Sequence, residues 1–107
     1  MDKTKTKLNK LLKTFLEIVD KCFFIESIYV FGSYANNKQK TYSDIDLALV
    51  SRDFQFTDTE TIMIILARIA RSTNSKIEPV VFSNEEIKKP VLGTLAWEVA
   101  NKGLKLR

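Results

Sequence analysis

The sequence contains no histidine and only one cysteine in 107 residues. The lack of histidine excludes Ser-His-Asp and Cys-His nucleophile systems, together with the usual Cys/His zinc sites. Cys22 cannot form an internal disulfide, and its place beside Phe23 and Phe24 predicts a small buried thiol in a cytoplasmic protein. Any metal chemistry must therefore depend on carboxylates.

Proline and glycine are also scarce, and there is no long hydrophobic run. The longest strongly apolar segment, residues 62–67, is too short to cross a bilayer, and the lysine-rich first segment lacks the apolar stretch of a signal peptide. The composition, 45% hydrophobic and 28% charged, is typical of a soluble globular protein with no membrane segment. We expect one domain, residues 1–107, so a second, substrate-binding domain would have to come from another chain or be absent.

Positive charge is concentrated at one end of the chain. The net charge is +4, yet the residues after position 13 carry 12 basic and 12 acidic side chains. Five lysines lie before that point: Lys3, Lys5, Lys7, Lys10 and Lys13. No aromatic residue interleaves with them, so they favour a solvated helix face over a nucleic-acid interface. Nucleic-acid binding remains a lesser alternative, and it predicts affinity that weakens steeply with salt.

Hydrophobic periodicity predicts the order helix, strand, strand, helix, strand, helix. The expected ranges are a helix at 5–21, strands at 27–33, 44–50 and 76–82, a helix ending near 71, a short capped turn at 83–89, and a last helix from 91 to the glycine at 103 with a terminal strand after it. Thr57 and Glu60 have the spacing of a capping box for the second of these helices, and Ser33 suits the N-cap of a further short helix. Trp97 is expected in the core.

The connection between the first two strands is too short for a comfortable parallel crossover, so the sheet should be mixed. Pro79 lacks a backbone donor, which places the third strand at an edge or puts the proline near a strand end. Together these features predict an α/β (α+β) fold with a mixed β-sheet flanked by helices.

Asp44 and Asp46 lie at the start of the second predicted strand. Side chains alternate along a strand, so both carboxylates face the same side, with roughly 6.5 to 7 Å between their Cα atoms. Such a pair is, taken alone, more often two solvent-facing acids, but a divalent cation such as Mg²⁺ or Mn²⁺ would relieve their repulsion. Glu78 has the matching position in the third strand, so it is a candidate third ligand rather than only a rim acid.

Gly32 and Ser33 end the first predicted strand. A glycine allows a phosphate to approach the backbone closely, and free amides at the start of a helix favour an anion. Alone, this pair is more typical of a tight turn. Beside three converging acids, it supplies the second part of a site for a nucleoside triphosphate with bridging metal ions.

These residues resemble a known signature. Gly32-Ser33 followed by Ser43-Asp44-Ile45-Asp46-Leu47 is similar to the motif of the nucleotidyltransferase superfamily, in particular its minimal nucleotidyltransferase proteins. Glu78 matches the third carboxylate of that family, and residues 91–106 look like its last helix and terminal strand. The resemblance covers about residues 8–106.

The resemblance implies an enzyme that transfers a nucleoside monophosphate, AMP from ATP above all, to a hydroxyl acceptor and releases pyrophosphate. It implies that Gly32, Ser33 and Ser43 contact the nucleotide, and that Asp44, Asp46 and Glu78 are the catalytic metal ligands for Mg²⁺ or Mn²⁺. Small family members are often antitoxins of helical HEPN-domain proteins, and some attach AMP to a tyrosine of that partner. The resemblance therefore implies a HEPN-type partner.

Asn36-Asn37 departs from the Arg-Gly of many relatives, so Lys38, Lys40 or Arg52 would have to supply a cation for the triphosphate. This departure motivates a second hypothesis, a catalytically weak or inactive module that masks a partner protein. A small-molecule acceptor is a further variant, for which a homo-oligomer would have to complete the pocket. The acceptor, the preferred nucleotide and the oligomeric state are not determined by the sequence.

Overall fold

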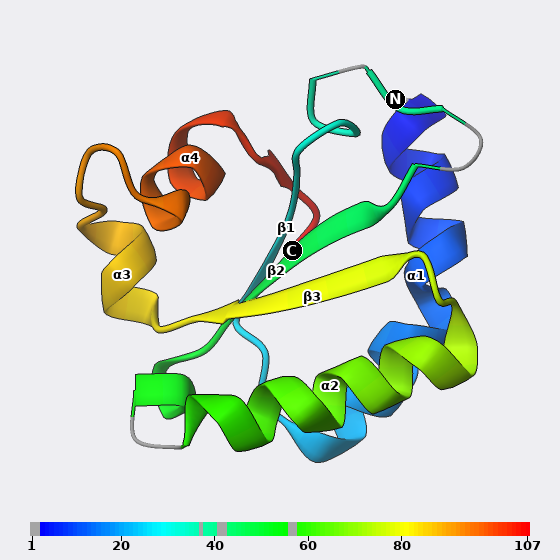
Figure 1. Cartoon of the computed structure of the whole chain (residues 1–107), viewed down its shortest axis with the longest axis horizontal. Helices are drawn as coiled ribbons and strands as arrows, with labels where there is room; N and C mark the ends of the chain where they lie inside the picture. Colours follow the sequence, from blue (N-terminus) through cyan, green and yellow to red (C-terminus); the bar gives the residue numbers. More distant parts are fainter. Residues whose placement is uncertain (1–2, 37, 41–42, 56–57) are drawn as a thin grey trace.

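A computed structural model of the chain describes residues 3–36, 38–40, 43–55 and 58–107 (Figure 1). The elements in chain order are α1 (Lys3–Cys22), β1 (Ser27–Phe31), β2 (Ile45–Val50), the 3-10 turn η1 (Arg52–Gln55), α2 (Thr59–Thr73), β3 (Ile77–Phe82), α3 (Asn84–Lys88), α4 (Leu95–Lys102) and β4 (Leu104–Lys105). None of the described helices is both long and apolar enough to pass through a membrane.

The strands form one sheet in the order β3-β2-β1-β4. β1 runs antiparallel to β2 and β4, whereas β2 and β3 are parallel, so the prediction of a mixed sheet is confirmed. The Ile45 amide donates to the Lys76 carbonyl, so Lys76 and every second residue after it turn their backbone groups toward β2. The backbone groups of the residues between them, Ile77, Pro79 and Val81, therefore point toward the open edge of the sheet. Pro79 therefore lies in an edge strand, as predicted, and its missing donor removes no bond within the sheet.

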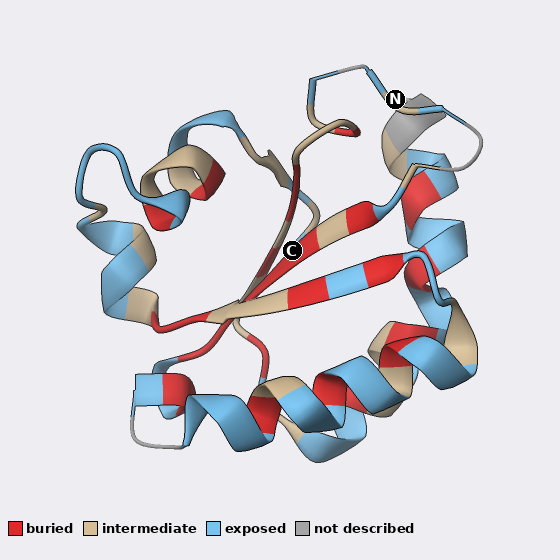
Figure 2. Ribbon diagram, in the orientation of Figure 1, coloured by how far each residue is buried: buried red, intermediate tan, exposed pale blue. Residues whose placement is uncertain are grey.

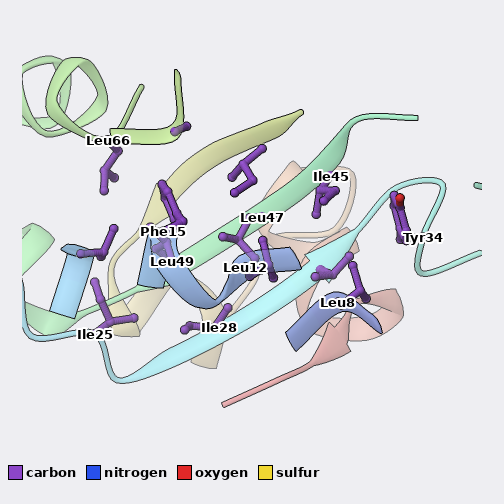
Figure 3. Packing of buried hydrophobic residues seen from close by; sticks show 14 of the residues in the cluster. Leu8, Leu12, Phe15, Ile25, Ile28, Tyr34, Ile45, Leu47, Leu49 and Leu66 are labelled. Atoms are coloured by element: carbon purple, nitrogen blue, oxygen red, sulfur yellow. The ribbon is translucent and has the colours of Figure 1, made fainter. Parts of the chain in front are cut away.

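The helices α1 and α2 cover one face of this sheet (Figures 1 and 3). Fully buried leucines and Phe15 of α1 pack there against alternate residues of the strands. The strand residues on this face are Ile28 and Val30 of β1, Ile45, Leu47 and Leu49 of β2, and Ile77 of β3. The strand alternation seen in the sequence thus buries this set completely or nearly so.

The opposite face of the sheet carries a smaller core under α4 (Figure 2). Ala96 and Val99 of α4 pack there with Phe31, Ala48 and Phe82 of the strands. This helix covers only part of the face. The strand residues of the same parity that lie nearest to the start of β2 and β3 are acidic, and they form the candidate site described below.

Three predicted helix starts are wrong. No helix follows Ser33: the described residues 32–36 form turns, in which the Asn36 amide donates to the Gly32 carbonyl at 3.2 Å. The left-handed φ of 72° at Gly32 redirects the chain, and Tyr34 is buried in the α1 face of the core (Figure 3). The N-cap of α2 is Asp58, which accepts from the Glu60 amide at 3.1 Å, and Thr57 lies outside the described residues.

The last helix starts later than predicted, at Leu95, because Thr94 caps it and Gly93 has a φ of 89°. Val91 and Leu92 consequently lie outside the helix. The capped turn at 83–89 is confirmed as α3, with a full capping box between Ser83 and Glu86.

Two predicted core positions are also wrong. Cys22 is exposed at the end of α1, beyond the cover of the sheet, and the half-buried Phe23 packs edge-to-face on Phe54 instead. Trp97 is only half-buried, because the face of α4 that meets the sheet is formed by Ala96 and Val99.

Candidate active site

Asp46 and Glu78 stand directly opposite each other in the parallel pair β2–β3. Both side chains share the parity of Ala48 and Phe82, and therefore lie on the α4 side of the sheet. Asp46 is half-buried, whereas Glu78 is exposed. Asp44 is exposed just before β2 and lies close enough for its charge to act on both other acids. The structure thus brings the three predicted acids together.

The crowding of these acids changes their proton affinity. Burial raises the pKa of Asp46 above its ordinary value, and the charges of Asp44 and Glu98 raise it further, while a hydrogen bond with Glu78 opposes the rise. The pKa of Glu78 is also raised, first by loss of hydration, then by the charges of Asp44 and Asp46 and by hydrogen bonds with both. A protonated Glu78 can therefore donate to its aspartate neighbours, which holds the three carboxyl groups as one coupled cluster.

Gly32 is fitted closely against Asp46. A Cβ placed on Gly32 would collide with Asp46 Oδ2, so only a glycine lets the backbone pass this close to the carboxylate. The Phe31–Asp46 register explains the proximity, because β1 ends where β2 begins. The turn and the acids, which are separate in the sequence, are therefore adjacent in the fold.

Local hydrogen bonds shape the segment after Gly32. The Lys38 amide donates to the Ser33 carbonyl at 2.8 Å. The Ser43 hydroxyl accepts from the Lys40 amide at 2.7 Å, and the Ser43 amide donates to the Lys40 carbonyl at 3.0 Å. Ser43 thus has a structural part in shaping this segment, and its hydroxyl proton remains available to a ligand.

Of the cations considered for the triphosphate, Arg52 is excluded by its position. It follows β2 at the far end of the sheet from Asp46, and its Nε lies 3.5 Å from Glu26 Oε1. The five or six residues of a strand span roughly 17 to 20 Å, which is beyond the reach of the side chain. Lys38 and Lys40 are exposed beside the Gly32 turn and remain the candidates.

Glu98 is the acid that the sequence analysis missed. It lies in the first turn of α4, and its charge acts on Asp46 across the space between helix and sheet. No spacing rule connects a helix residue to strand residues far earlier in the chain, so only the docking of α4 on the sheet could disclose it.

The donor set fits a hard divalent cation by its chemistry. Carboxylate oxygens are the ligands that Mg²⁺ and Mn²⁺ prefer, and a cation would offset the repulsion that raises both pKa values. Across the described residues, no three ligating side chains are already gathered into a complete metal-binding geometry.

The fold and these residues define a class: a mixed α/β domain that presents paired strand carboxylates beside a glycine turn, as phosphoryl-transferring proteins do. The family model "Polymerase beta, Nucleotidyltransferase" matches residues 10–104. The chain belongs to this nucleotidyltransferase family.

Solved structures share the fold of this chain. A protein of Sulfolobus solfataricus, provisionally described as a nucleotidyltransferase, is 23% identical, with a TM-score of 0.67 over 95% of this chain and 81% of its own. A toxin–antitoxin structure with AMP-PNP is 26% identical, with a TM-score of 0.57 over 96% of this chain and 72% of that chain. No curated protein matches the sequence significantly.

Proposed function

We propose that this protein is a metal-dependent nucleotidyltransferase that transfers AMP from ATP to a hydroxyl group of a partner protein, in the manner of an antitoxin acting on a HEPN-type toxin. The observation that carries the proposal is the direct pairing of Asp46 with Glu78, with Asp44 and the Gly32 turn beside them. The similarity to a toxin–antitoxin structure with AMP-PNP supports both the adenine nucleotide and the protein partner.

Asp44 and Asp46, with help from Glu78, would hold Mg²⁺ or Mn²⁺. A bound cation would stabilise the negative charge that develops on the α-phosphate and on the leaving pyrophosphate. The turn at Gly32 and Ser33 would bind the outer phosphates with its backbone amides, because no side chain at Gly32 blocks their approach. Lys38 and Lys40 would offset their charge from the exposed segment that follows.

In the transfer, the acceptor oxygen forms a bond to the α-phosphorus, and the bond from that phosphorus to the bridging oxygen breaks. Pyrophosphate leaves with the electron pair of that bond. The acceptor proton would pass to the Glu78 carboxylate, which stands opposite Asp46 in the β2–β3 pair.

The test is label transfer to the product of the neighbouring gene, with Mg²⁺ and ATP labelled on the α-phosphate. We expect the partner to become labelled, and we expect no label when only the γ-phosphate carries it. Asp46→Asn should reduce the transfer at least a hundredfold, as the loss of a metal ligand does. Glu17→Gln on α1 is the matched control, because it removes one exposed acid away from the cluster and should leave transfer unchanged.

Loss of folding must be separated from loss of chemistry. Asp46→Asn removes a like charge opposite Glu78, which should raise the metal-free unfolding free energy by roughly 0.2 to 1 kcal/mol. Thermal unfolding without metal measures this. Undiminished transfer by Asp46→Asn, or label delivered from the γ-phosphate, would refute the proposal that this protein is a metal-dependent nucleotidyltransferase.

The masking hypothesis makes a different prediction for the same proteins. Calorimetry with ATP and Mg²⁺ should show binding that depends on the metal ion if the chain is an enzyme. A complex with the partner that forms without any metal-dependent nucleotide binding would favour masking instead.

A further inference from the structure

A cleft of about 360 Å³ lies where the first part of α1 meets the turn after β1 and the connection between α2 and β3. The volume is within the range of roughly 300 to 1,000 Å³ that is typical of small-molecule sites. These three segments are far apart in the sequence, so only the fold assembles the cleft. We call it the lysine cleft, and its lining consists of Lys7, Leu11, Tyr34, Asn74 and Lys76.

The lysine cleft is positively charged. Among the residues that the structure describes, no acid lines it, and Lys7 is exposed without an ion pair to any of them. Four other clefts, of about 290 to 450 Å³, are each lined by an acid: Asp20, Glu78, Glu86 or Glu98. The lysine cleft differs from all four because its charge attracts an anion.

Tyr34 brings a hydroxyl to the lysine cleft. The residue is only 5% exposed, and Figure 3 shows it at the end of the core cluster, beyond Ile45 and Leu8. Its hydroxyl forms no hydrogen bond with any residue that the structure describes, and it is not sealed away from solvent either. Since Tyr34 lines the cleft, its hydroxyl is left to bond with what enters there.

Asn74 supplies a second neutral donor. Its side-chain oxygen accepts from the Lys76 amide at 3.0 Å, which turns the side-chain NH₂ group away from that amide. Its backbone is held as well, because its amide donates to the Ala70 carbonyl at 2.8 Å and its carbonyl accepts from the Ile77 amide at 3.0 Å. The Asn74 side chain is therefore fixed in place with N–H donors to offer.

We infer that the lysine cleft binds a phosphate group. Four donor side chains that come from three segments suit the tetrahedral oxygens of phosphate, and the lysine ammonium is a common phosphate contact. The inference goes beyond the proposed function, because the cleft lies on the α1 side of the sheet, whereas Asp46 and Glu78 lie on the α4 side. It holds whether or not the protein transfers AMP.

Two sources can supply this phosphate. Tyr34 comes two residues after Gly32, and the Lys76 carbonyl accepts from the Ile45 amide at 2.7 Å, so the cleft begins close to the proposed nucleotide site. The outer phosphates of bound ATP are one source. A free phosphate or a phosphorylated small molecule is the other, and both present the same oxygens to the same side chains.

The test is a titration of the isotope-labelled protein with inorganic phosphate at constant ionic strength, followed by NMR through the Asn74 side-chain amide signal. Metal ions are left out, so that the three acids repel the anion and add no second site. We expect a saturable shift with a Kd of about 1 mM. Lys7→Gln should weaken binding about tenfold, and Tyr34→Phe roughly threefold, because each removes a donor to the anion.

Lys13→Gln is the matched control. Lys13 is an exposed lysine of the same helix that does not line the cleft, so this change removes the same charge and should leave the Kd unchanged. The other amide signals of each spectrum show whether the variant is folded. Tyr34→Phe keeps the ring that packs in the core.

A repeat with saturating Mg²⁺ and ATP identifies the source. If ATP shifts the Asn74 signal and prevents the response to phosphate, the outer phosphates of ATP occupy the cleft. If phosphate still shifts the signal when ATP is present, a free phosphate-bearing molecule is the ligand.

Two results would overturn the inference. One is a response to phosphate no larger than the response to chloride at equal ionic strength. The other is equal weakening by Lys7→Gln and Lys13→Gln. A failure of AMP transfer, in contrast, would refute only the proposed function.

Discussion

The backbone at Gly32 and the carboxylate of Asp46 share a space that one methyl group would fill. Residue-scale complementarity of this kind explains why a glycine stands at the end of β1. It also shows why a Gly-Ser pair is weak information in a sequence, since the residue that requires the glycine is fourteen positions away. The structure supplies the contact, whereas the metal-binding and phosphate-binding roles remain proposals.

Gly32→Ala should damage both stability and ligand binding. The left-handed φ of 72° should cost roughly 1 to 2 kcal/mol for alanine, and the added Cβ should displace Asp46. We expect a melting temperature several degrees lower, and Mg²⁺-dependent ATP binding reduced beyond detection by calorimetry.

Gly93→Ala is the control for this change. Its φ is 89°, but a Cβ there would meet nothing within 4 Å, so it should cost similar stability and keep Mg²⁺-dependent ATP binding. If Gly32→Ala bound ATP as tightly as the wild type does, the proposed role of the Gly32 turn in phosphate binding would be contradicted.

At the scale of the elements, strand alternation accounts for most of what could be predicted. Period-two patterning placed Ile45, Leu47 and Leu49 toward one core and Asp46 toward the other face, and the structure agrees. The helix ends were less predictable, because several residues near each end can serve as caps. Asp58 caps α2, where the sequence pattern favoured Thr57. Thr94 caps α4, which therefore begins later than the sequence pattern predicted.

Pro79 protects the open edge of β3, and its replacement should expose that edge. Pro79→Val would add an outward N–H between Ile77, whose amide already donates to the Asn74 carbonyl, and Val81, which extends the edge available for strand pairing. We expect concentration-dependent association in sedimentation velocity experiments. Ile77→Val, a change in the same outward row that adds no donor, should sediment like the wild type, and a Pro79→Val protein that stays unassociated would contradict the idea.

At the scale of the whole molecule, Arg107 ties distant parts of the chain together. Its guanidinium donates to both oxygens of Asp20 at 2.8 Å and to the Ile25 carbonyl at 3.2 Å. The end of α1, the approach to β1 and the segment after β4 are thereby joined. The hydrogen bond and the charge of Arg107 lower the pKa of Asp20 below its ordinary value of 3.8, while burial opposes the shift.

Asp20→Asn should therefore weaken the fold in a pH-dependent way. A lowered folded-state pKa stabilises the protein above pH 3.8, and this contribution is lost as the pH falls further and the carboxylate takes up a proton. Because both side chains are about 40% exposed, solvent screening limits the effect at neutral pH to about 0.5 to 1 kcal/mol. Urea unfolding of wild type and variant at neutral and acidic pH measures it.

The difference in unfolding free energy between the wild type and Asp20→Asn should disappear at acidic pH. Glu17→Gln, on the same helix, should show little difference at either pH. A gap for Asp20→Asn that persists unchanged in acid would contradict the ion pair as its cause.

The sequence by itself determined the strands, the main helices, the mixed sheet and the three acids, because local periodicity and turn chemistry act over a few residues. The tertiary structure alone decided that Arg52 lies at the far end of the sheet from Asp46, that Cys22 is exposed and that the charge of Glu98 acts on Asp46. These facts depend on how α4 docks and where strands end in space. Such long-range arrangements leave no regular spacing in the chain.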